Sequence, residues 1–165
     1  MTAYDPARWA NFFLGELGAA AALVGLLFVA ISINLERILS YAWLPGRAAE
    51  TLVLLVNVLV AATFGLLPDQ AARTLGWEVL VGSGAVWLGV LVSQVRARRH
   101  YRGQPASWFA VRVLITQVGT LPFVVGGVSL VAGRGGGCYW LVAATIAAVL
   151  AALENSWVLL VEIVR

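Results

Sequence analysis

Long apolar stretches alternate with short polar ones along this chain, and the pattern repeats five times. Each apolar stretch has about the 20 residues that a helix needs to cross the hydrocarbon of a bilayer. In chain order the stretches cover residues 11–34, 48–67, 76–95, 108–131 and 139–164. The pattern therefore predicts an all-α fold, a polytopic transmembrane helical bundle of five spans with short loops, in which residues 1–165 form a single integral membrane domain.

The composition favours the same class of protein. The chain is 61% hydrophobic and 12% charged, whereas soluble domains are about 45–50% apolar and about 25% charged. A lipid-facing surface can use this excess of apolar residues, and a soluble core cannot. The net charge is +3, and all of the basic residues are arginines, several of which lie in one loop between two spans. Membrane orientation explains that charge, so we expect no nucleic-acid partner.

The arginine-rich loop between the third and fourth spans sets the expected orientation. It contains Arg96, Arg98, Arg99 and Arg102, and loops rich in basic residues stay on the cytoplasmic side. Five spans then put the N-terminus outside and the C-terminus in the cytoplasm. We expect a multi-pass protein of a prokaryotic cytoplasmic (inner) membrane. The four arginines are candidate contacts for anionic lipid, or they serve only as a topology signal.

Catalytic and metal-binding chemistry has little support in the sequence. Cys138 is the only cysteine and His100 the only histidine, and they lie far apart in the chain. The chain therefore offers no intramolecular disulfide and no cysteine-based metal site. It also shows no nucleophile–base pair and no cofactor motif. We expect no enzyme activity, no metal and no cofactor.

Small residues form a stripe along the first span. Asn11, Gly18, Gly25 and Ser32 are spaced by seven, and Ala22 falls beside them. Seven residues are nearly two helical turns, so these positions share a face. Small residues allow close helix approach in lipid. We predict that Gly18, Ala22, Gly25 and Ser32 form a helix-packing interface, within one protomer or between protomers.

The segment after the first span alternates apolar and polar residues over 35–47. This alternation predicts a short amphipathic surface segment. A Pro-Gly pair at Pro45 and Gly46 is expected to end it. The second span would then begin at about Ala48.

Ionisable and amide side chains inside the spans are the candidate site. Glu154 lies well inside the fifth span, where an acid is costly and is a functional-site hypothesis by default. Asn57, Arg112 and Gln117 lie in the second and fourth spans. We predict that they converge with Glu154 on one polar interior, with Arg112 as a partner for the acid. The alternative is an interhelical hydrogen bond or salt bridge that only holds the bundle together.

The fourth span has a second feature that suits a cavity or gate. Pro122 removes a helical hydrogen bond and should kink the helix, which makes it a candidate hinge. Thr116 and Thr120 precede it and can supply hydroxyls to the freed carbonyls. The alternative is a purely structural kink.

Asn155 follows Glu154 directly but faces elsewhere, because adjacent residues differ by about 100° around a helix. It shares a stripe with Glu162 and three alanines, Ala144, Ala148 and Ala151. We therefore predict a structural role for Asn155 and a functional role for Glu154.

These features predict a homo-oligomeric channel or channel-like pore with a polar interior around Glu154. Five helices leave little room for a solute path in one protomer, so self-association is expected, with the lipid bilayer as the other partner. Two alternatives stay open: a small proton-coupled carrier, and a non-transporting accessory or regulatory subunit of a larger membrane complex.

Overall fold

The structure is a computed structural model that describes residues 2–41, 43–100 and 106–164, without the side chains of residues 99, 100, 106, 108 and 158–164. The described part contains the helices α1 (Ala10–Ile33), α2 (Leu35–Ser40), α3 (Leu44–Gly65), α4 (Ala72–His100), α5 (Ala106–Ala132) and α6 (Tyr139–Val164), and no strand. All of these helices except α2 are long and apolar enough to cross a membrane. The prediction of an all-α bundle with five helices long and apolar enough to span a membrane is confirmed.

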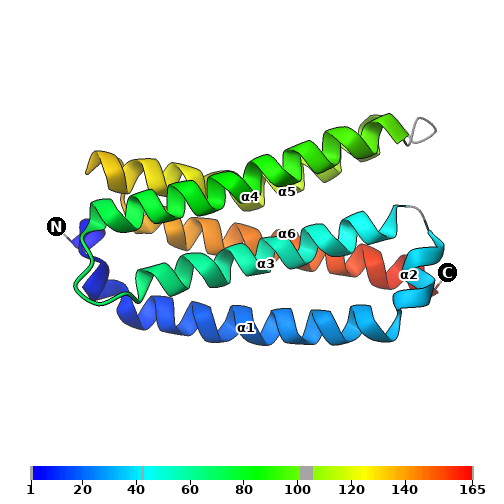
Figure 1. The fold of residues 1–165 in the computed structure, drawn as a ribbon, viewed down its shortest axis with the longest axis horizontal. Helices are drawn as coiled ribbons and strands as arrows, with labels where there is room; N and C mark the ends of the chain where they lie inside the picture. The colour runs from blue at the N-terminus through cyan, green and yellow to red at the C-terminus, as the bar shows by residue number, and fades with distance from the viewer. Residues whose placement is uncertain (1, 42, 101–105, 165) are drawn as a thin grey trace.

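The five long helices lie side by side, and the two chain ends lie at opposite ends of the bundle (Figure 1). Helix α3 is central, because it packs against α1, α4 and α6. Helices α4 and α5 form a closely packed pair, and α5 also packs along α6. Helix α1 packs mainly on α3, so most of its surface is free of neighbours within the chain.

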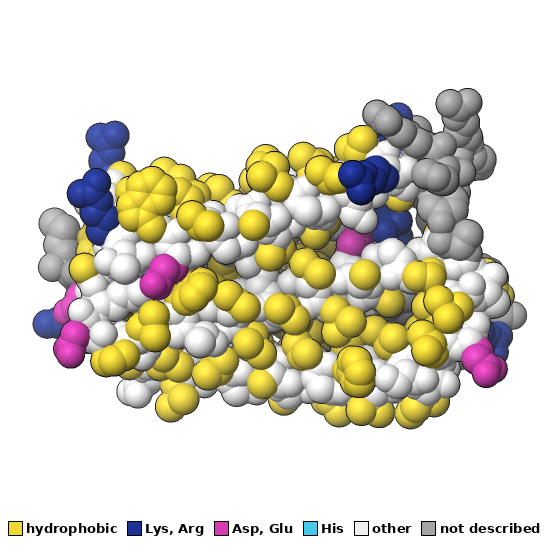
Figure 2. Space-filling model, viewed as in Figure 1, with side chains coloured by type: hydrophobic (Ala, Val, Ile, Leu, Met, Phe, Trp, Pro, Cys, Tyr) yellow, Lys and Arg dark blue, Asp and Glu magenta, His cyan; other side chains and the backbone are white. Residues whose placement is uncertain are grey.

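The outer surface of the bundle is suited to lipid. Large apolar side chains are exposed along its length, and Leu26 and Ile33 on α1 are 70% and 78% exposed. Figure 2 shows hydrophobic side chains over the length of the molecule, with most charged groups toward its two ends. This distribution is that of a multi-pass membrane protein.

The start of α3 differs from the sequence prediction. Pro45 and Gly46 lie in the first turn of α3, which begins at Leu44, so they do not end the preceding segment. Proline is tolerated there because the first turn has no intrahelical partner for its missing N–H. The short amphipathic segment is α2, and its Ile38 is buried against Leu44 and Ala48.

The N-terminal segment is fastened to the loop before α6. The Cys138 N–H donates to the Ala3 carbonyl at 2.8 Å, and the Gly136 N–H donates to the Tyr4 hydroxyl at 3.0 Å. Gly137 has φ of 54°, and a Cβ there would lie 2.1 Å from the Ala3 carbonyl oxygen. Only glycine fits this conformation and this close approach.

Two glycines bring α4 and α5 together. A Cβ on Gly76 would lie 2.7 Å from the backbone nitrogen of Val131, and one on Gly127 would lie 2.9 Å from the Cα of Leu80. The missing side chains let the two backbones approach closely, which is how helices associate in lipid.

We predict that Gly76→Ala destabilises the bundle by about 1–3 kcal/mol, because its methyl group overlaps the α5 backbone. Gly84→Ala on the same helix is the matched control, since no atom lies within 4 Å of its Cβ position. Alanine is the better helix former, so Gly84→Ala should be neutral or stabilising by up to about 1 kcal/mol. Reversible unfolding in mixed detergent micelles measures both, and equal effects would contradict this packing.

We also predict that Cys138 reacts slowly with N-ethylmaleimide in the folded protein. Its side chain is fully buried, and burial raises the pKa of the thiol to about 11. About 0.1% would then be thiolate near pH 8, and the thiolate is the nucleophile. Labelling followed by mass spectrometry should be rapid only after denaturation or removal of residues 2–8. Rapid labelling of the intact folded protein would contradict the packing of the N-terminal segment on the loop before α6.

Candidate functional site

A buried ion pair joins α3 and α5. Arg112 donates from Nε to Oε2 of Glu50 at 2.9 Å and from Nη2 to Oε1 at 2.8 Å. The side chains of Arg112 and Glu50 are 12% and 3% exposed. The two parallel hydrogen bonds are the strongest arrangement that these groups can form, and they fix the guanidinium in one orientation.

The sequence around the pair makes room for it. Gly46 lies one turn before Glu50 on α3, and a Cβ there would approach Nη2 of Arg112 to 3.1 Å. The glycine thus leaves space for the guanidinium near the start of α3. In the space-filling view, acidic and basic atoms are visible in a hollow between α3 and the α4–α5 pair (Figure 2).

Helix α4 adds a glutamine to this region. Nε2 of Gln94 donates to Oγ1 of Thr116 at 3.0 Å, and Oγ1 of Thr116 donates to the backbone carbonyl of Arg112 at 3.0 Å. Gln94 is 1% exposed, and its Oε1 has no hydrogen-bond partner among the described residues. A chain of hydrogen bonds therefore runs from Gln94 on α4 through Thr116 to the backbone carbonyl of Arg112 on α5.

Helix α6 contributes Asn155 at the same level. A Cβ on Gly119 would touch both Leu54 of α3 and Ala151 of α6, so these two residues lie level with each other. Glu50 is one turn before Leu54, and Asn155 is one turn after Ala151. Because α3 and α6 run antiparallel, Asn155 lies level with Glu50. Asn155 is buried, and its Nδ2 has no partner among the described residues.

These side chains form one polar layer across four helices, between the bundle centre and its C-terminal end. We call it the polar layer, and it consists of Glu50, Gln94, Arg112, Thr116 and Asn155.

Two further polar pairs lie beyond the layer, toward the N-terminal end of the bundle. Ser83 donates to Oδ1 of Asn57 at 2.9 Å, and Nε1 of Trp87 donates to Oε1 of Gln117. Asn57 follows Glu50 by seven residues on α3, which is about 10 Å along a helix. The side-chain amide nitrogens of Asn57 and Gln117 are buried and unpaired among the described residues.

Unpaired amide atoms inside a membrane bundle are costly. Asn57, Gln94, Gln117 and Asn155 each have one buried N or O atom without a protein partner in the described part. Each such atom costs about 1–3 kcal/mol unless it is hydrogen-bonded. In proteins such atoms are commonly satisfied by buried water, which typically makes about three hydrogen bonds.

Glu154 does not belong to this interior. It is exposed on the outer face of α6, next to an apolar groove between α5 and α6. Arg112 pairs with Glu50, so the predicted partnership of Arg112 with Glu154 is wrong. The physical reason is the 100° step between adjacent helical residues, which turns Asn155 inward and Glu154 outward. Asn57 bonds to Ser83, Gln117 to Trp87 and Arg112 to Glu50, so the convergence of these three residues on one site stays a prediction.

The candidate hinge lies in an unbroken helix. Helix α5 continues through Pro122 to Ala132. Thr120 is buried, and its Oγ1 donates to the carbonyl of Thr116 at 2.8 Å. The hydroxyls of Thr116 and Thr120 thus bond to the carbonyls one turn earlier, those of Arg112 and Thr116, and not to the Val118 carbonyl that Pro122 frees, so the expected partnership is wrong. The hinge role of Pro122 stays a prediction.

The small-residue stripe of α1 faces away from the rest of the chain. Gly18, Ala22, Gly25 and Ser32 are all exposed, and no atom lies within 4 Å of the Cβ positions of Gly18 and Gly25. The stripe is therefore not an interface within the protomer, and an interface between protomers stays a prediction.

The predicted lipid contacts are described only in part. Arg96 and Arg98 are exposed on α4, and the Arg98 guanidinium lies 5.1 Å from the centre of the Phe109 ring. The side chains of Arg99 and Arg102 lie outside the described residues. Anionic lipid at this loop stays a prediction.

Sequence reasoning missed Glu50 and Gln94 as site residues, because both lie near the predicted ends of their spans. A signal for Glu50 was present: it shares a helix face with Asn57, seven residues later. Gln94 had no comparable signal, since its partner Thr116 is on another helix.

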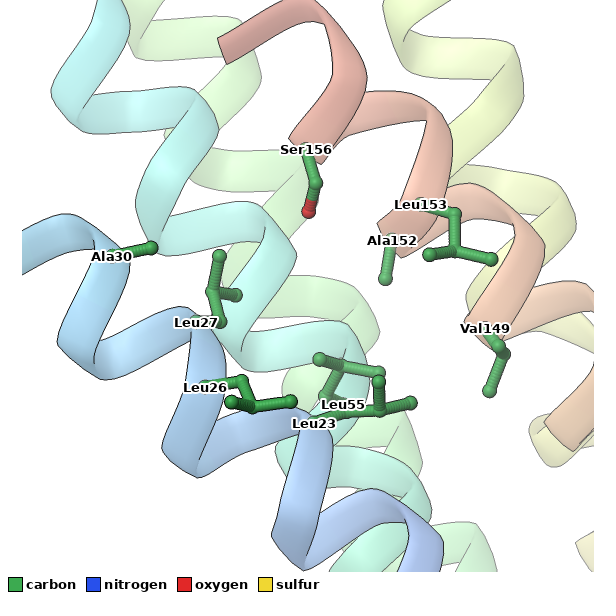
Figure 3. Close-up of a pocket in the computed structure, with 9 residues that line it drawn as sticks. All are labelled: Leu23, Leu26, Leu27, Ala30, Leu55, Val149, Ala152, Leu153 and Ser156. Carbon is green, nitrogen blue, oxygen red and sulfur yellow. The ribbon is translucent and has the colours of Figure 1, made fainter. Parts of the chain in front are cut away.

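A second hollow lies between α1, α3 and α6, and it has a volume of about 210 Å³. In Figure 3 leucine and alanine side chains from α1 and α6 face this space, and the Ser156 hydroxyl points toward it. Its apolar lining suits hydrocarbon, so we do not include it in the polar layer.

No family model, curated protein or solved structure matches this chain. The functional assignment rests on the geometry of the polar layer.

We predict that Glu50→Ala lowers the free energy of unfolding by about 3–5 kcal/mol, because it leaves Arg112 as an unpaired buried charge. Glu50→Leu combined with Arg112→Met removes both charges and should recover most of that loss. The matched control is Glu36→Ala on the exposed face of α2, expected within about 0.5 kcal/mol of wild type. Unfolding in mixed micelles measures all three, and equal stability of the Glu50 and Glu36 variants would contradict the ion pair.

Proposed function

We propose that the protein is a homo-oligomeric, channel-like membrane protein whose polar layer is a gate, closed by the Glu50–Arg112 ion pair. One observation carries this proposal: a bidentate buried ion pair lies among buried amides that keep unpaired atoms. Ionisable groups at such depth are costly, and they mark ion or solute pathways in membrane proteins.

The polar groups beyond the layer support a continuous path. Asn57, Ser83 and Gln117 extend the line of hydrogen-bonding groups toward the N-terminal end of the bundle. A row of amides and hydroxyls with unused hydrogen-bonding capacity can hold a file of water molecules through an apolar bundle. Such a file of water would carry protons, small ions or small polar solutes.

The ion pair has the properties of a closed gate. Its charges cancel, and the guanidinium fills the space beside Gly46. Helices α3 and α5 touch each other at few other places, so separation of Arg112 from Glu50 would remove the main polar contact between them. Either freed side chain would then offer its charge to a solute.

A proton-coupled carrier is the second candidate. A carboxylate and a guanidinium buried together inside a helical bundle are the kind of groups that line proton and solute pathways in carriers. A carrier of this kind would couple its flux to a proton gradient.

Self-association and orientation complete the proposal. The exposed small-residue stripe, represented by Gly18 and Gly25, supports close contact with a second copy. The C-terminal end of the bundle carries most of the arginines, which supports a cytoplasmic location for that end. The gate would then lie in the cytoplasmic half of a prokaryotic inner membrane.

The test is flux through purified protein in liposomes. We expect potassium conductance or proton flux above that of protein-free liposomes. Glu50→Gln should change that flux by about tenfold or more, the ratio that roughly 1.4 kcal/mol of gating free energy gives. The exchange of charges in Glu50→Arg with Arg112→Glu should restore flux toward the wild-type value, because it rebuilds the pair.

Glu36→Gln is the control, since this carboxylate is exposed on α2 and is not part of the polar layer. Flux that needs a proton gradient in wild type would favour the carrier over the channel. The absence of flux in wild type and in every folded variant would contradict both and would favour an accessory subunit.

A further inference from the structure

Glu154 occupies one end of an open groove on the lipid-facing side of α5 and α6. The groove has a volume of about 630 Å³. Apart from Glu154, its described lining is apolar and consists of Leu114, Ile115, Val118, Ala143, Ile146, Ala147, Leu150 and Ala151. The groove therefore combines one acidic group with a long hydrocarbon surface.

The acid lies at one end of the groove. Ala143 also lines it and is eleven residues earlier in α6, which is about 16 Å along the axis of an α-helix. A molecule in the groove would have its polar end at Glu154 and its apolar body along α5 and α6.

The negative charge of Glu154 favours a positively charged ligand in the groove. No basic residue is among the described lining residues. Arg112 is on the same helix as Leu114, but its guanidinium is bound to Glu50 in the interior. An isolated carboxylate beside hydrocarbon is expensive. A cationic group beside this carboxylate would offset that cost through a charge-assisted hydrogen bond.

We propose that this groove binds a singly charged amphiphilic cation, with its ammonium group on the Glu154 carboxylate and its alkyl chain between α5 and α6. A zwitterionic lipid fits less well, because its phosphate would find no basic group in the described lining. This binding site is separate from the polar layer, so the proposal does not depend on the gate.

The test uses a spin-labelled alkylammonium and protein in phosphatidylcholine nanodiscs. The motionally restricted fraction in electron paramagnetic resonance spectra, corrected for empty nanodiscs, gives the dissociation constant. We expect Glu154→Gln to weaken binding by about tenfold or more, as the loss of a hydrogen bond to a charged group implies. Ala147→Phe should weaken it as well, because the ring fills the groove and leaves the carboxylate in place.

The matched control is Glu16→Gln, which removes a partly exposed acid from α1, away from this groove. It should bind the probe as wild type does. Unchanged binding by Glu154→Gln would overturn the proposal, as would equal binding of a spin-labelled alcohol or of spin-labelled phosphatidylethanolamine. Disulfide formation between two Glu154→Cys protomers in nanodiscs would also overturn it, because a second copy would then cover the groove.

Discussion

The arrangement of the bundle depends on one interaction, the buried ion pair between Glu50 and Arg112. It joins α3, the helix around which the others pack, to α5, which otherwise contacts α3 at few places. A buried ion pair is weak support for stability, because desolvation of both charges offsets most of their attraction. Its value lies in orientation: two parallel hydrogen bonds fix the position of α5 along α3. A pair with small net stability and a large effect on orientation suits the proposed gate.

The apolar surroundings increase the effect of polar contacts on how the helices are arranged. In lipid the helices have no hydrophobic drive to associate, so close packing at Gly76, Gly119 and Gly127 and polar contacts decide their positions. The same surroundings make each unpaired amide atom of Asn57, Gln94, Gln117 and Asn155 expensive. A bundle that only had to be stable would replace them with apolar side chains. Their presence beside an ion pair is the observation that supports the proposed conduction path.

Hydrophobic periodicity and span length predicted the fold because both are local properties of the chain, and the five long helices end within a few residues of the predicted spans. The partners of polar residues are set by helix rotation and neighbour order, which local patterns do not contain. The sequence pattern therefore predicts Glu154 as the partner of Arg112, whereas the structure pairs Arg112 with Glu50. The inward turn of Asn155 was predictable, since it shares a stripe with buried alanines. The outward turn of Glu154 follows from the same geometry.

The partner of Arg112 tests this account most directly. Solid-state NMR of the protein in lipid bilayers, with ¹⁵N in the arginine guanidinium groups and ¹³C in the glutamate carboxyl groups, reports which carboxyl lies beside Arg112. Contact at 2.8–2.9 Å between nitrogen and oxygen predicts a strong dipolar coupling from Arg112 to Glu50. The coupling should vanish in Glu50→Gln and persist in Glu154→Gln. Coupling of Arg112 to Glu154, or to no glutamate, would contradict the polar layer described above.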